Sequence, residues 1–161
     1  MELTKVTVTT GAFNYSPIIK TALVGGLASS LLETATVNTT IAPGTGINAT
    51  INYDVNTQSV LYFSTNATAN WTLNIRYATG TRLNSALAIG QSVTFVMIVT
   101  TGATAYYNSA ITIDGVSITP KYQGGTAWSA GNASSWDVYT YTAIKTAANT
   151  YILLAAQTQF K

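Results

Sequence analysis

The sequence predicts an all-β protein, namely an antiparallel β-sandwich of jelly-roll-like type with at most one short helix. Threonine accounts for 29 of the 161 residues, and its β-branched side chain suits a pleated sheet and disfavours a helix. Apolar and polar residues alternate along many short segments, which is typical of half-buried strands. Residues that favour turns separate these segments at the spacing found in sandwiches and barrels.

The clearest alternation lies in residues 47–56, where five residues face one way: Ile47, Ala49, Ile51, Tyr53 and Val55. The same period of two predicts further strands at residues 5–10, 60–65, 71–78 and 92–101. In the segment 71–78, the expected buried face consists of Trp71, Leu73, Ile75 and Tyr77. Two other segments stay ambiguous between a helix and a loop, residues 18–33 and residues 82–90.

Two hairpins follow from the turn residues. Asp114 and Gly115 sit between alternating arms that run from residue 111 to 119, and this pair favours the positive φ angles of a tight primed turn. A second hairpin is expected from residues 136–146 and 151–159, with its turn at 147–149. It would place the C-terminal segment inside the sheet, so truncation of that segment should destabilise the fold.

The composition limits both domain organisation and partners. A length of 161 residues fits a single β-sandwich domain spanning 1–161. Only seven basic and five acidic residues occur, and they form no run that could neutralise a row of phosphates, so we expect no nucleic-acid binding. The N-terminus lacks the pattern of a signal peptide, and the longest apolar-leaning stretch, residues 18–32, is too short and interrupted to span a bilayer. We therefore expect no membrane partner.

The residues that most enzymes use are missing. There is no histidine and no cysteine, so the commonest general base, the thiol nucleophile and the usual zinc ligands are absent. Of the carboxylates, Asp114 is explained by its turn, while Asp54 and Asp137 lie on polar-facing strand positions and are interpreted as solvated. The sequence thus predicts a protein that is not an enzyme, with no catalytic residue, no cofactor and no metal site.

Three aromatic residues could form a contact surface for a sugar or a protein. Trp128 lies in the Gly- and Ser-rich loop 123–135, and Tyr106 and Tyr107 precede Asn108. Tyrosine and tryptophan provide rigid, amphipathic contact area. For Trp128 an equal alternative is that its ring folds back and caps the end of the sandwich.

The C-terminal part of the chain carries a resemblance to a known family. Residues 120–146, which include Gly-Gly-Thr-Ala at 124–127 and Asp-Val-Tyr-Thr at 137–140, are followed by residues 150–160 with the ending Gln-Thr-Gln-Phe. These segments resemble a β-module of virion structural proteins of tailed bacteriophages, particularly marine and cyanobacterial ones. The likeness extends more loosely through residues 70–76 and 59–63, so that it covers mainly residues 60–161.

The resemblance implies a non-enzymatic component of the virion surface. A small stand-alone domain suits a capsid decoration or cement protein that binds the major capsid protein or other virion proteins and forms a homo-oligomer, with a trimer favoured. The alternative is a tail fibre, collar or spike component that binds the host surface or its glycans. A free carbohydrate-binding module and a glycosidase rank below these two.

Residues 1–12 are a candidate N-terminal arm or edge strand. Lys5, Val6 and Val8 would lie in a strand that adds to the sheet of a neighbouring subunit through main-chain hydrogen bonds. This arm would staple shell proteins together.

Overall fold

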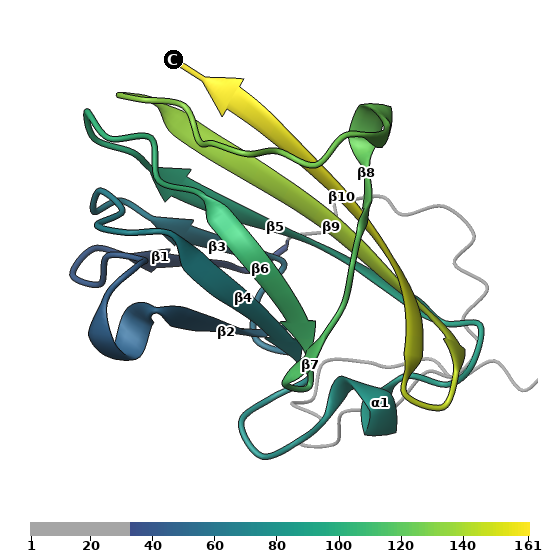
Figure 1. The fold of residues 1–161 in the computed structure, drawn as a ribbon. Helices are drawn as coiled ribbons and strands as arrows, with labels where there is room; N and C mark the ends of the chain where they lie inside the picture. Colours follow the sequence, from purple (N-terminus) through teal and green to yellow (C-terminus); the bar gives the residue numbers. More distant parts are fainter. Residues whose placement is uncertain (1–32) are drawn as a thin grey trace, which may run out of the picture. The chain divides into compact units, whose positions relative to one another are not determined.

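The computed structural model describes residues 33–161, which fold into two β-sheets (Figure 1). The larger, sheet A, has six strands in the order β1 (Ala35–Asn38), β3 (Val60–Phe63), β5 (Ser92–Thr100), β9 (Trp136–Ala147), β10 (Thr150–Phe160) and β8 (Lys121–Tyr122). The smaller, sheet B, has four strands in the order β2 (Thr50–Asp54), β4 (Trp71–Arg76), β6 (Asn108–Ile113) and β7 (Val116–Ser117). The other regular elements of residues 33–161 are one short helix, α1 (Leu83–Ala86), and two 3-10 turns, Gly46–Asn48 and Gln123–Gly125.

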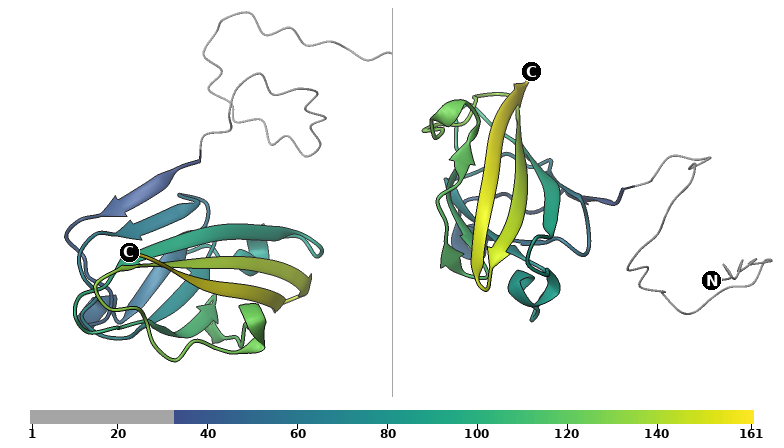
Figure 2. Two further views of the ribbon diagram at one scale, coloured as in Figure 1. Left: turned by 90° about the horizontal axis from the view of Figure 1, so that it is seen from above. Right: turned by 90° about the vertical axis from the view of Figure 1, so that its right-hand side faces the viewer.

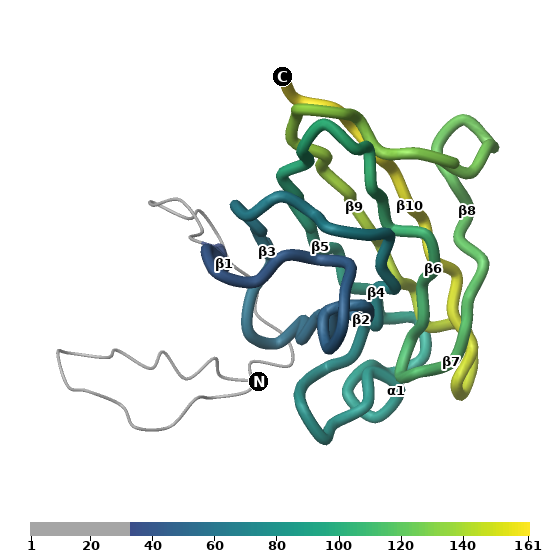
Figure 3. The backbone as a smooth tube through the Cα atoms, turned by 60° about the vertical axis from the view of Figure 1, so that its left-hand side comes forward, coloured from purple at the N-terminus to yellow at the C-terminus, as the bar shows by residue number. Residues whose placement is uncertain are grey.

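The all-β class is confirmed for the described residues, but the prediction of an antiparallel, jelly-roll-like sandwich is wrong. In the first part of the chain, successive strands from β1 to β6 alternate between sheet A and sheet B, as Figure 3 traces. Each return to a sheet brings the next strand back in the same direction, so β1, β3 and β5 pair in parallel, and so do β2, β4 and β6. A strand of the opposite sheet thus serves as the crossover that parallel pairing requires.

Both predicted hairpins are present and supply much of the antiparallel pairing. Asp114 and Gly115 have φ angles of 53° and 82° and join β6 to β7. The long strands β9 and β10 pair along their whole length and turn through Ala148 and Asn149, where Asn149 has a φ of 53° (Figure 2). β5 also pairs with β9 in antiparallel fashion, whereas β8 pairs with β10 in parallel, so β9 alone runs opposite to the other five strands of sheet A.

The predicted strands are found with shorter ends. The segment 47–56 forms a strand only from Thr50 to Asp54, because the preceding residues make a 3-10 turn and leave Ile47 94% exposed. Tyr77 lies beyond the end of β4 and is 38% exposed, so its place on the buried face was predicted wrongly. Within 82–90 the chain forms the four-residue helix α1. The strand expected at 5–10, the arm at 1–12 and nearly all of the ambiguous segment 18–33 lie outside the described residues.

Aromatic rings from both sheets fill the space between them. Phe95 of β5 lies 4.4 Å from Tyr53 of β2 and 5.4 Å from Tyr141 of β9, measured between ring centroids. Trp71 of β4 meets Tyr139 edge to face at 5.9 Å. All five residues are at most 1% exposed. Edge-to-face and offset contacts of this kind add to the stabilisation that comes from burying the rings.

The hydroxyl groups of these tyrosines find acceptors inside the protein. Tyr141 donates to the side-chain oxygen of Asn108 at 2.9 Å, and Tyr53 donates to the carbonyl oxygen of Val96 at 3.2 Å. Asn108, which is 1% exposed, also donates to the carbonyl oxygens of Trp71 and Ala110. The hydroxyls of Tyr53 and Tyr141 are therefore buried with partners, since an unpaired one would be costly. The buried hydroxyl of Tyr151 finds no hydrogen-bond partner among residues 33–161.

These buried phenols should make the fold sensitive to alkali. Burial raises the pKa of Tyr151 to about 12 and that of Tyr53, Tyr139 and Tyr141 above its usual value. Because the folded state holds these protons more tightly than the unfolded state, whose tyrosines titrate near pH ~10, this stabilisation is complete below pH ~10 and is lost as the pH rises through the folded values.

We therefore expect the buried tyrosines to ionise, in a titration of tyrosinate absorbance, only together with the loss of far-ultraviolet circular dichroism. A single titration of all tyrosines near their usual pKa, with the circular dichroism unchanged, would contradict the packing described above.

Candidate functional site

The outward side of sheet A is the most distinctive surface of residues 33–161. Five of the six strands contribute only uncharged side chains to it, and these alternate with inward-facing ones. The sixth strand, β8, adds Lys121 at the edge, beside Leu154. We call the five-strand part of this surface the A face. Its members are Ala35, Val37, Val60, Tyr62, Ser92, Thr94, Val96, Ile98, Thr100, Trp136, Val138, Thr140, Thr142, Ile144, Ile152, Leu154, Ala156, Thr158 and Phe160.

The A face carries no acidic or basic side chain, and several of its large apolar residues are exposed. Val37 is 56% exposed, Trp136 and Phe160 are each 53% exposed, and Ile152 and Leu154 are 44% and 45% exposed. These residues come from β1, β9 and β10, so the exposed apolar surface extends across the sheet. A broad apolar area of this kind is a mark of a protein interface.

The outward side of sheet B has the opposite character. Asn52, Asn74 and Thr112 stand side by side on three parallel strands and form a hydrogen-bonded row, with 2.8 Å between Asn74 and each of its two neighbours. Next to this row, Asp54 forms an ion pair with Arg76. The guanidinium of Arg76 donates a hydrogen bond to the Asp54 carboxylate, and this bond raises the pKa of the arginine. Sheet B thus presents polar groups to water, and the two faces differ in what they can bind.

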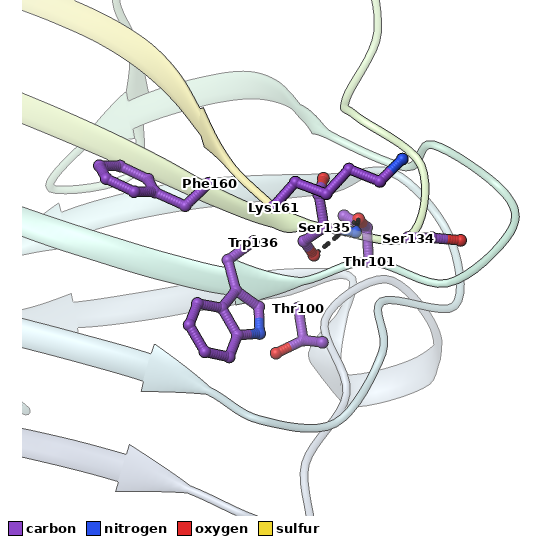
Figure 4. A pocket seen from close by; sticks show the side chains of 7 residues that line it. All are labelled: Thr100, Thr101, Ser134, Ser135, Trp136, Phe160 and Lys161. Carbon is purple, nitrogen blue, oxygen red and sulfur yellow. Dashed lines mark hydrogen bonds between the residues drawn. The ribbon is translucent and has the colours of Figure 1, made fainter.

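A groove lies at the end of the A face where β5, β9 and β10 come together (Figure 4). Its volume is about 460 Å³. The lining residues are Thr100, Thr101, Ser134, Ser135, Trp136, Phe160 and Lys161. Tyr62 meets Trp136 edge to face at 6.4 Å, so that the indole is held on one side while about half of its surface remains exposed. The groove combines aromatic rings with hydroxyl groups.

The aromatic residues predicted as a contact surface lie at another part of the molecule. Trp128 is half-buried, its ring packs between Tyr122 and Tyr139, and its indole nitrogen donates to the carbonyl oxygen of Asn108 at 2.6 Å. Of the two readings of Trp128, this geometry is that of a cap on the core. Tyr106 and Tyr107 are also half-buried, and the ring of Tyr106 packs against the core. Their role in binding stays a prediction.

The loop that carries Trp128 is held by a buried carboxylate. Asp137 is 0% exposed and accepts hydrogen bonds from the backbone and side-chain nitrogens of Asn132, at 3.0 and 2.7 Å, and from Gln157 at 3.2 Å. A side chain at Gly131 would lie 2.3 Å from the carbonyl oxygen of Tyr106, so only glycine permits this close approach. The prediction of a solvated Asp137 is wrong, because its position faces the core with Tyr139.

The other two strand and turn carboxylates also have structural partners. Asp54 is bound to Arg76, as described above, and its side chain is 21% exposed. Asp114 accepts hydrogen bonds from the backbone nitrogens of Leu83 and Asn84 at 2.7 and 3.0 Å, so it secures the start of α1 in addition to forming its turn. At the end of this helix the buried ammonium of Lys145 donates to the carbonyl oxygens of Asn84 and Leu87. A charge thus complements each end of α1.

The other predicted elements of the site can be placed only in part. Lys5, Val6 and Val8, the expected N-terminal staple, lie outside residues 33–161. Within the described part of the chain, no three or more acidic side chains come close enough to hold a metal ion. None of the helices in residues 33–161 is long and apolar enough to cross a membrane.

Comparison with known proteins finds no family model, curated sequence or solved structure that matches this chain.

Proposed function

We propose that this chain is a non-enzymatic structural protein of a tailed-bacteriophage virion, and specifically a capsid decoration or cement protein. The observation that carries the proposal is the A face, an uncharged and partly exposed apolar surface on one side of a molecule whose other sheet is polar. The resemblance of residues 60–161 to virion β-modules gives the class of particle. The virion surface is then its location.

The A face suits permanent packing against protein. Burying it removes aliphatic, aromatic and threonine side chains from water and desolvates no ionised group, so the favourable apolar term is not offset by the cost of dehydrating charges. Obligate interfaces share this depletion of charge. The partners we propose are the major capsid protein or other virion proteins, together with further copies of this chain.

In this proposal the N-terminal segment supplies a second attachment. Its alternating residues Lys5, Val6 and Val8 would extend the sheet of a neighbouring shell protein through main-chain hydrogen bonds. Deletion of residues 1–12 should abolish binding to particles and leave the thermal unfolding of the domain unchanged, which particle co-sedimentation and circular dichroism would measure. Full occupancy by the deleted protein would remove the arm from the proposal.

A matched pair of variants tests the main-chain part of this prediction. Proline at positions 6 and 8 removes two backbone donors, whereas alanine at the same positions keeps them. The Val6→Pro/Val8→Pro protein should lose particle binding, and the Val6→Ala/Val8→Ala protein should retain most of it. Equal binding by the two would show that the segment does not attach through its backbone.

The second candidate is a tail fibre, collar or spike component that contacts host glycans. The groove at the end of the A face favours it, because half-exposed Trp136 and Phe160 beside hydroxyl groups form a surface on which sugar rings could stack. Copy number on purified particles separates the two candidates. A shell component repeats with the symmetry of the capsid, so roughly hundreds of copies are expected, against roughly a dozen or fewer for a tail component.

A further inference from the structure

The size of the A face matches one partner surface of a stable complex. With strands about 4.8 Å apart and about 3.4 Å per residue, the strands β1, β3, β5, β9 and β10 cover roughly 650 Å². Two such surfaces together give about 1,300 Å², which falls within the range of specific interfaces. The face is therefore large enough to be buried by a single partner of the same size.

The chemistry of the A face makes a copy of itself a suitable partner. Because the five strands of the face present no acidic or basic side chain on it, two copies can meet there without repulsion or unpaired charge. Two sheets can stack face to face about 10 Å apart when their side chains are aliphatic, aromatic and small polar groups. A face of this composition also offers a charged partner no opposite charge to bind.

The edges of the A face add complementary charges. Lys121 on β8 pairs in register with Leu154, which lies level with Thr142 and Thr94. At the opposite edge, Ala35 of β1 lies in the same cross-strand row as Val60 and Val96. Glu33 comes two residues before Ala35, and Thr94 comes two residues before Val96, so Glu33 lies near the row of Thr94. The two edges of sheet A therefore carry opposite charges in about the same row.

We propose that two copies of this chain pack A face against A face about a twofold axis that runs parallel to the strands. Rotation about this axis leaves the position of each residue along the strand direction unchanged and exchanges the two edges of the sheet. Lys121 of one copy therefore lies opposite Glu33 of the other. The uncharged centre is buried, and the charged residues form the rim, the arrangement that protein interfaces share. The inference concerns the isolated protein and does not depend on where the virion would carry it.

A charge at the centre of the A face tests this proposal. Thr140 lies between Val96 and Ala156 at an exposed position, so a longer side chain there does not disturb the core. Thr140→Lys and Thr140→Glu should each raise the dissociation constant of the dimer by about a hundredfold or more, because a buried interface then contains an unpaired charge. Analytical ultracentrifugation of the full chain over a dilution series measures this change.

The control is the same substitution on the other sheet. Thr50 is exposed on the outward side of sheet B, and Thr50→Lys should leave the dissociation constant and the thermal unfolding unchanged. The proposal is overturned if the wild-type chain is monomeric at every concentration, which is the result expected when residues 1–32 or a different protein cover the face. It is also overturned if the chain forms a trimer, the state that the sequence favours, or if Thr140→Lys associates as tightly as the wild type.

A charge exchange tests the axis. Lys121→Glu places like charges over each other at both edges and should weaken the dimer about threefold to tenfold, since exposed ion pairs contribute little each. Adding Glu33→Lys to the same chain should restore wild-type association. A double variant as weak as or weaker than the single one would overturn this arrangement of the two copies.

Discussion

Replacing Asp137 with alanine is expected to lower the free energy of unfolding by about 3 kcal/mol or more. The carboxylate is fully buried and accepts hydrogen bonds from Asn132 and Gln157. Without it, these donors lose their acceptor inside the protein, and the loop that carries Trp128 loses its attachment to β9. Urea denaturation followed by tryptophan fluorescence measures the change.

Asp54→Ala is the matched control. Asp54 also lies on a strand, but its side chain is partly exposed and bound to Arg76. Exposed ion pairs contribute about 1 kcal/mol or less, so the loss should be much smaller than at Asp137. Equal losses at the two positions would mean that Asp137 is not the buried acceptor described above.

Ending the chain after Asn149 is expected to abolish the folded state. This truncation removes β10, which pairs with β9 along its entire length and buries Leu153 and Ala155 against the core. Because β10 lies between β9 and β8, its loss leaves the backbone hydrogen-bonding groups along one edge of each of these strands without a partner strand. Domains are stable by only about 5–15 kcal/mol, and the removal of a paired inner strand exceeds such a reserve. Dispersion of amide signals in a proton–nitrogen NMR spectrum would measure the outcome.

The control for this truncation ends the chain after Gln157. It keeps Leu153, Ala155 and the hydrogen bond from Gln157 to Asp137 and removes only the last strand pairs and Phe160. We expect a folded protein that is destabilised by about 1–2 kcal/mol. A well-dispersed spectrum from the chain that ends at Asn149 would contradict the place of β10 inside sheet A.

The class of the fold could be predicted because its signals are local. Period-two alternation marks a strand from its own residues, and a pair such as Asp114-Gly115 marks a tight turn by its backbone preferences. Parallel pairing could not be predicted in this way. Alternation says which side of a strand is buried, but it does not say whether the next strand returns to the same sheet or crosses to the other.

The buried charges show a signal that could have been used. Asp137 and Lys145 have the same parity along β9 as Tyr139, Tyr141 and Ala143, all of which are buried. Parity alone therefore places both charges toward the core. Their partners could not be found from the sequence, since Asn132 and Gln157 for Asp137, and the carbonyl groups of α1 for Lys145, are brought to them by the tertiary fold.

The candidate interaction surface was predictable only in kind. Scarcity of charge indicates a protein suited to close packing, but the concentration of uncharged residues on one face emerges from the register of five strands. Trp128 was singled out because it stands alone in a polar loop. Trp136 and Phe160 have about half of their surface exposed, and their parity, opposite to that of Tyr139 on β9 and Leu153 on β10, is a signal that could have placed them on the outward side.

A cryo-electron microscopy reconstruction of the intact particle, with this chain fitted into it, tests the proposed virion role most directly. We expect the A face to be covered by protein density, from another copy of the chain or from a shell protein, and the polar outward side of sheet B to face solvent. A map in which the A face is open to solvent, or a particle that lacks the chain, would contradict this role.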